Sequence, residues 1–89
     1  MLTVLKYTVS VEDYFSLDLP EGAKILTVQE QHGDAQVWAL VNPDNPTKTR
    51  HFRLAGTGHP IKESQDELDY IGTFQLAGGN FIGHIFELK

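Results

Sequence analysis

Residues 69–88 read DYIGTFQL-AGGN-FIGHIFEL, two apolar segments separated by Gly78-Gly79-Asn80. Glycine and asparagine tolerate the positive φ angles of tight hairpin turns, and β-branched and aromatic residues favour strands on either side. This stretch therefore predicts a β-hairpin. Elsewhere in the chain, no segment of helical length carries an apolar stripe with a period of 3.6 residues, so we expect a protein without long helices.

Gly, Pro, Asn and Asp interrupt the rest of the chain at four further places and separate short segments rich in Val, Ile, Thr, Phe and Tyr. We expect seven strands, at residues 3–9, 14–19, 24–30, 35–41, 49–55, 69–76 and 81–88. Residues 61–69 are polar and acidic and follow a proline, so we expect a loop with at most one helical turn there. Seven short, mostly antiparallel strands predict an all-β fold, either a small β-sandwich or a barrel-like domain.

The alternation of apolar residues assigns faces to two of these strands. Residues 35–41 are apolar on both faces, with Val37, Ala39 and Val41 on one face and Trp38 and Leu40 on the other. A strand of this kind is central in its sheet or carries an interface on its second face. In the preceding strand, we expect Leu26 and Val28 to share one face.

Length and composition limit the class of protein. The 89 residues form one β domain over 1–89, with little buried surface, so we expect homo-oligomers. The chain has no cysteine, which excludes disulfides and thiolate zinc sites and fits a reducing compartment. The net charge of −5 argues against a nucleic-acid polymer as partner. We see no signal peptide and no membrane-spanning segment, so we expect a cytoplasmic protein without membrane contact.

Positive charge is concentrated in residues 48–53, which hold three of the seven Lys and Arg residues of an acidic chain. The segment leads into Gly56-Thr57-Gly58-His59, where glycines would allow backbone N–H groups to converge on an anion. The pattern predicts a pocket for a small anionic ligand, in which arginines hold the anion, the loop adds donors and an aromatic ring stacks on the ligand. Its candidate residues are Arg50, Arg53, Thr57, Gly58, His59, Phe52 and Trp38.

Two structural readings compete with this pocket. Glycine-rich segments that end in proline are most often turns, and Lys or Arg on an edge strand prevents unwanted pairing between sheets. The loop also matches neither a P-loop nor a dinucleotide fingerprint. Regular alternation would place Arg50 and Arg53 on opposite faces, so a single pocket would need two subunits to use both.

Catalytic and metal sites have little support in the sequence. No serine lies in a Gly-x-Ser-x-Gly turn, and no local pair of histidines has metal-ligand spacing, although folding could bring His51, His59 and His84 together. We therefore expect no enzyme activity, no metal and no cofactor.

Several segments resemble, in order and spacing, a family of small uncharacterised proteins from phages, prophages and bacteria that is known as a domain of unknown function. These segments are residues 19–26, 37–43, 56–59, 70–73 and 81–87. The resemblance implies a phage-related protein expressed in a bacterial host cell, and it transfers no activity.

Three functions remain open at this point. The first is a homo-oligomeric binder of a small anionic ligand, such as a nucleotide immune signal that it would sequester. The second is an inhibitor of a host defence or nucleic-acid-handling protein, which would bind through the acidic residues Glu63, Asp66, Glu67 and Asp69. The third is a structural component with no ligand.

Overall fold

The computed structural model contains seven β-strands and two short 3-10 turns. The strands are β1 (Thr3–Thr8), β2 (Tyr14–Pro20), β3 (Lys24–Gln31), β4 (Asp34–Val41), β5 (Thr47–Gly56), β6 (Leu68–Leu76) and β7 (Phe81–Leu88). The turns are η1 (Gln65–Glu67) and η2 (Ala77–Gly79). All seven expected strands are present, and their ends differ from the expected ends by at most two residues. Neither of these short 3-10 elements is long and apolar enough to span a membrane.

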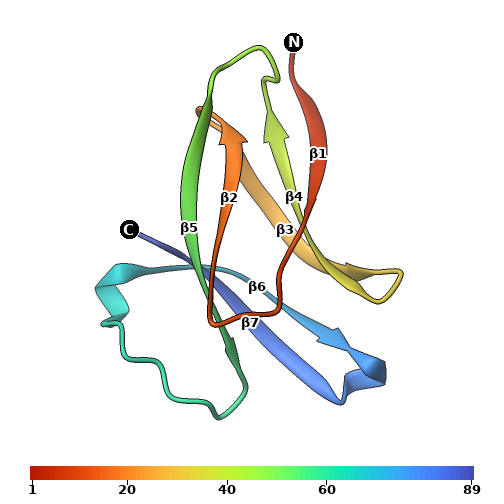
Figure 1. The fold of residues 1–89 in the computed structure, drawn as a ribbon, viewed down its shortest axis with the longest axis vertical. Helices are drawn as coiled ribbons and strands as arrows, with labels where there is room; N and C mark the ends of the chain where they lie inside the picture. Colours follow the sequence, from red (N-terminus) through yellow and green to blue (C-terminus); the bar gives the residue numbers. More distant parts are fainter.

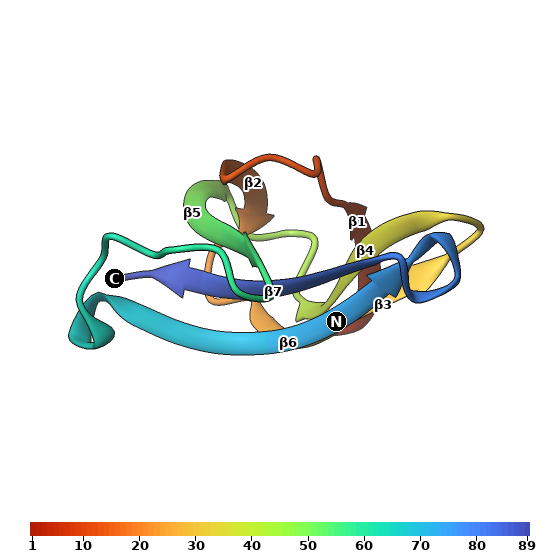
Figure 2. The same cartoon turned by 90° about the horizontal axis from the view of Figure 1, so that it is seen from below.

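The strands form two antiparallel sheets, one with the order β1-β4-β3 and one with the order β2-β5-β7-β6 (Figure 1). This confirms the predicted all-β fold. The apolar strand β4 is central in the three-stranded sheet, as its two apolar faces indicated. The two sheets lie close together where β3 runs beside β6 (Figure 2).

The junction of β3 and β6 depends on a glycine. A Cβ atom on Gly72 would lie only 2.7 Å from Cγ1 of Val28, so no larger residue fits there without movement. Both strands are irregular at this point, with register shifts between Ile25 and Thr27 and between Tyr70 and Gly72. Such bulges turn side chains away from regular alternation and bend the strand.

The bulge in β3 makes one sequence prediction wrong. Val28 is buried in the core, but Leu26, which was expected on the same face, is 46% exposed. The extra residue between Ile25 and Thr27 shifts the alternation, so that Leu26 lies outside the core.

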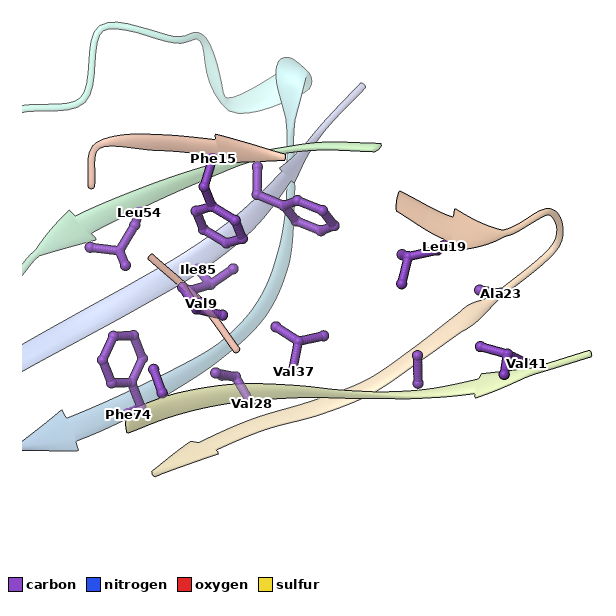
Figure 3. Close-up of a cluster of buried hydrophobic side chains, with 13 residues drawn as sticks. Val9, Phe15, Leu19, Ala23, Val28, Val37, Val41, Leu54, Phe74 and Ile85 are labelled. Carbon is purple, nitrogen blue, oxygen red and sulfur yellow. The ribbon is translucent and has the colours of Figure 1, made fainter. Parts of the chain in front are cut away.

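The core lies between the two sheets (Figure 3). Phe15 of β2 and Phe52 of β5 stack on each other within the core, with ring centroids 5.1 Å apart. The other members are small or aliphatic apart from Phe74; they are Val9, Leu19, Ala23, Val28, Ala35, Val37, Ala39, Val41, Leu54, Phe74 and Ile85. The molecule measures only 16 Å along its shortest axis, and 19 of its 89 residues are buried.

Candidate functional site

The two arginines of the predicted anion site lie in different places. Arg50 is on the same face of β5 as Phe52 and lies where β3 begins and β7 ends. Arg53 is on the opposite face and lines a separate hollow with Pro60 and Lys62. The structure therefore does not bring both guanidinium groups into one pocket within a single chain.

Arg50 is held by an ion pair and a backbone contact. Its Nε and Nη2 donate to the two carboxylate oxygens of Glu87, each at 2.6 Å, and Nη1 donates to the carbonyl of Ala23 at 2.5 Å. The hydrogen bonds that Arg50 donates to Glu87 raise the pKa of Arg50 above its ordinary value. The side chain is 22% exposed, and a guanidinium has more N–H groups than these three bonds use. Arg50 can therefore still donate to a ligand.

A cavity of about 500 Å³ opens beside this ion pair, between β3 and β6. We call it the Arg50 cavity; its lining residues are Ala23, Lys24, Ile25, Leu26, Arg50, Asp69, Tyr70, Ile71 and Glu87. Its volume falls in the range of about 300–1,000 Å³ that is common for small-molecule sites. The bulges of β3 and β6 border this cavity and place Leu26 and Ile71 at its walls.

The four charged side chains of the Arg50 cavity differ in whether they have an ion-pair partner. Arg50 is paired with Glu87, and Asp69 lies 3.4 Å from Lys89. Lys24 is the one charged residue of the lining without an ion-pair partner. The lining thus carries two positive and two negative side chains, and Lys24 is the positive charge among them that no carboxylate pairs with directly.

A second hollow of about 400 Å³ lies on the other side of the same ion pair. It is lined by Lys48 and His51 as well as by Glu21, so it is polar and of mixed charge. His51 also lies 3.2 Å from Ser16 Oγ, away from the other histidines.

Arg53 stabilises the chain segment after β5. Its side chain is only 7% exposed and pairs with Glu63 at 3.1 Å. Its other N–H groups donate to the carbonyls of Leu54 and Pro60, and its guanidinium lies 5.0 Å from the ring centroid of Tyr14. Since these contacts fasten the loop between β5 and β6 to the outer face of the sheet, Arg53 has a structural role.

Tyr14 and Glu63 are coupled within this cluster. The Tyr14 hydroxyl donates to Glu63 Oε2 at 2.5 Å. This hydrogen bond is the main cause that lowers the pKa of Glu63, and the nearby Arg53 lowers it further. The same hydrogen bond raises the pKa of Tyr14.

The predicted glycine loop is a turn whose amide groups are largely used within the chain. The N–H of Thr57 donates to Ile82, the N–H of His59 donates to Gly56, and Gly58 adopts a φ of +84°. Thr57 and His59 line a hollow of about 210 Å³, which contains no lysine or arginine. The loop thus lies apart from both arginines.

One polar cluster was missed by the sequence analysis. Thr57 Oγ1 lies 2.7 Å from His84 Nε2, Thr73 Oγ1 lies 2.9 Å from His84 Nδ1, and the Tyr70 hydroxyl lies 2.7 Å from Thr73 Oγ1. Thr73 is directly opposite His84 in the β6–β7 pair. The register of this hairpin could have predicted that contact, but the contact with Thr57 depends on the tertiary fold.

The two predicted stacking residues differ in exposure. Phe52 is fully buried in the core and cannot contact a ligand from solvent. Trp38 is half-buried on the outer face of β4, where Lys6 Nζ lies 5.8 Å from its ring centroid. Neither residue lines the Arg50 cavity.

The acidic segment around η1 is engaged mainly in internal contacts. Glu67 accepts hydrogen bonds from Ser64, Glu63 pairs with Arg53, and Asp69 pairs with Lys89. This leaves less free acidic surface than the sequence indicated.

Comparison with protein families assigns the chain to a group. The family described as Domain of unknown function (DUF7352) matches residues 1–89. The chain belongs to this family. The DUF7352 match covers the whole chain, but it carries no activity and gives no indication of a phage origin. Neither the curated proteins nor the solved structures include a significant match. The function of this DUF7352 chain must therefore be argued from its own residues.

Proposed function

We propose that this protein is a non-catalytic binding protein for a small anion with an apolar body, which it holds in the Arg50 cavity. The observation that carries the proposal is the position of Arg50 and Lys24 beside the aliphatic side chains of the same lining, in a hollow of about 500 Å³.

The charges of the cavity favour an anion of low charge. Lys24 has no ion-pair partner, and Arg50 has N–H groups to spare, so together they suit one carboxylate or phosphate. A polyanion is less suitable because Glu87 and Asp69 also line the cavity and would repel further negative charge.

The walls of the cavity favour a ligand with an apolar part. Ile25, Leu26 and Ile71 supply aliphatic surface, of which Leu26 is 46% exposed. Covering this surface with a ring or an alkyl chain removes apolar area from water, at about 25 cal/mol per Å². The ligand class is thus an aromatic or aliphatic carboxylate or a nucleoside monophosphate.

A narrower form of the proposal concerns nucleotide signals. If the chain is phage-related and resides in the cytoplasm of a bacterial host, as its sequence resemblance implies, an intracellular nucleotide is a suitable candidate, and binding without hydrolysis would sequester it. Of the seven residues first assigned to the ligand, this proposal keeps Arg50 and adds Lys24 and Leu26.

Thermal shift and calorimetric titration with a panel of mononucleotides, cyclic nucleotides and aryl or alkyl carboxylates test the proposal. A ligand that binds the folded chain raises its melting temperature by mass action. We expect Lys24→Gln and Leu26→Ser to weaken binding about tenfold each, because each removes one contact of the order of 1–2 kcal/mol.

Lys62→Gln is the matched control, since Lys62 is an exposed lysine that lies near Tyr14 in a different hollow. It should leave the affinity unchanged. The proposal is wrong if no member of the panel shifts the melting temperature, or if Lys62→Gln weakens binding as much as Lys24→Gln does.

A further inference from the structure

Strand β1 presents an open sheet edge. It pairs with β4 on one side only and forms the end of the three-stranded sheet (Figure 1). Four of the first five residues of the chain, in β1 or directly before it, are large and exposed apolar residues, with exposed fractions of 97% for Met1, 63% for Leu2, 49% for Val4 and 40% for Leu5. An edge of this kind is a template for pairing with another strand.

The structure defines which backbone groups of β1 point outward. Val9 N–H donates to the Ala35 carbonyl in line with the β1–β4 register, so the odd-numbered residues exchange hydrogen bonds with β4. By alternation, the N–H and C=O groups of Leu2, Val4, Lys6 and Thr8 point away from β4.

Strand β1 has only one of the usual features that protect an edge, the charged residue Lys6. It has no proline and no bulge, and its one charged residue, Lys6, is held on the outer face of its own sheet by Gln31 and the Trp38 ring. The edge strand β2, by contrast, contains Asp18 and ends in Pro20.

The other two edge strands are already occupied. Strands β3 and β6 lie against each other at the junction of the two sheets. Strand β1 is thus the edge that remains available for a partner.

We infer that β1 pairs with β1 of a second copy of this chain, antiparallel about a two-fold axis at Leu5, so that the two three-stranded sheets become one sheet of six strands. Charge allows this approach although each copy carries a net charge of −5, because residues 1–11 contain no Asp or Glu. This inference does not depend on the ligand proposed for the Arg50 cavity.

Hydrogen-bond alternation and charge together select this register. Since outward residues must face outward residues, the two-fold axis must lie at a residue and not between two residues. Among residues 2–8, only an axis at Val4, Leu5 or Lys6 pairs five or more residues of each strand. An axis at Lys6 would oppose two ammonium groups, which is unfavourable. An axis at Val4 would pair only residues 2–6 of each strand.

An axis at Leu5 uses the whole strand. It pairs residues 2–8 of both copies, places Lys6 opposite Val4 of the second copy, and brings the two Leu5 side chains together. The two Leu5 residues would then face each other directly without exchanging hydrogen bonds. Their Cα atoms would be about 4.5 Å apart, which is within the range for a disulfide.

The absence of native cysteine makes cross-linking a direct test. Under mild oxidation we expect Leu5→Cys to form a covalent dimer. Val11→Cys is the control, because Val11 is similarly exposed but lies outside β1, and we expect this variant to stay unlinked. The inference is overturned if Leu5→Cys does not cross-link, or if Val11→Cys cross-links equally well.

Sedimentation equilibrium gives a second measurement that needs no cross-link. The wild-type chain should reach twice its monomer mass of 10.0 kDa as its concentration rises. Val4→Pro should remain monomeric, because it removes an outward N–H without breaking a β1–β4 hydrogen bond. A wild-type chain that stays monomeric, or a folded Val4→Pro variant that still dimerises, would contradict the inference and leave a foreign strand as the candidate partner.

Discussion

Arg50, Phe52 and Arg53 lie within four residues of one strand and have three different roles. Arg50 forms an ion pair at the end of the core face, Phe52 fills the core, and Arg53 fastens a loop on the outer face. Each role follows from the face and the neighbours that the side chain meets, because successive residues of a strand point to opposite sides.

Phe52→Ala should strongly destabilise the protein. Phe52 is 0% exposed and stacks on Phe15, so truncation loses buried area and leaves a cavity, at a cost of about 3–5 kcal/mol. Urea denaturation followed by tryptophan fluorescence measures this loss. His51→Ala, at the exposed neighbouring position, should cost less than about 1 kcal/mol. Equal losses for the two variants would contradict the assignment of Phe52 to the core.

Glu63→Gln should remove part of the acid sensitivity of the fold. The pKa of Glu63 is lowered in the folded chain, so its contribution to stability is present above the ordinary glutamate pKa and is lost as pH falls through the folded value. The difference in free energy of unfolding between wild type and Glu63→Gln should therefore be largest near neutral pH and shrink on acidification.

Denaturant titrations over a pH series measure this difference. Asp66→Asn is the matched control, since Asp66 is an exposed carboxylate in the same segment without an ion pair or side-chain hydrogen bond. The interpretation fails if the wild type and Glu63→Gln keep a constant difference from neutral to acidic pH.

At the scale of elements, the two sheets depend on the contact between β3 and β6. Gly72 allows this contact because it has no side chain where Val28 packs. The same bulged segments of β3 and β6 border the Arg50 cavity, so the closeness of the two strands also shapes the candidate site.

Gly72→Ala should destabilise the protein by about 1–3 kcal/mol, because the added methyl group overlaps Val28 and forces the strands apart. When Val28→Ala is combined with Gly72→Ala, the Cγ atoms of Val28 that the added methyl group would overlap are no longer present. In a double-mutant cycle we expect the two substitutions together to cost less than the sum of their separate costs. Additive costs would show that Gly72 and Val28 do not constrain each other.

At the scale of the whole molecule, the thin shape limits the core. An extent of 16 Å along the shortest axis leaves few positions far from water, and 19 of 89 residues are buried. A domain of this size is marginally stable by itself and gains from a partner subunit. The pairing proposed for β1 would supply such a gain.

Pairing through β1 should make the melting temperature depend on protein concentration. Because association stabilises the folded state by mass action, the wild-type melting temperature should rise by a few degrees per tenfold increase in concentration. Differential scanning fluorimetry measures this slope. Val4→Pro should have no slope and Val11→Lys should keep it; a flat slope for the wild type would argue against dimerisation.

Local patterns in the sequence were enough to predict the strands and the fold class. Turn residues mark the chain reversals and alternation marks the buried faces, as for Val37, Ala39 and Val41. Alternation failed at Leu26, where a bulge inserts a residue into β3, because the position of a bulge depends on the partner strand.

The candidate site could be predicted only in part. The concentration of basic residues on β5 predicted Arg50 as a candidate site residue, but it could not show that Glu87 pairs with Arg50 or that Glu63 pairs with Arg53. Those carboxylates are 37 and 10 residues away in the sequence, and only the packing of the sheets and loops brings them to the guanidinium groups.

The amino-acid sequence by itself therefore determined seven antiparallel strands, a cysteine-free acidic chain and a basic segment on β5, since each of these follows from local residue types. Tertiary structure decided which charges are neutralised, where β3 and β6 border a cavity, and that β1 is an open edge without a proline or a bulge. These properties depend on contacts between residues that are distant in the chain, and alternation along a single strand does not define them.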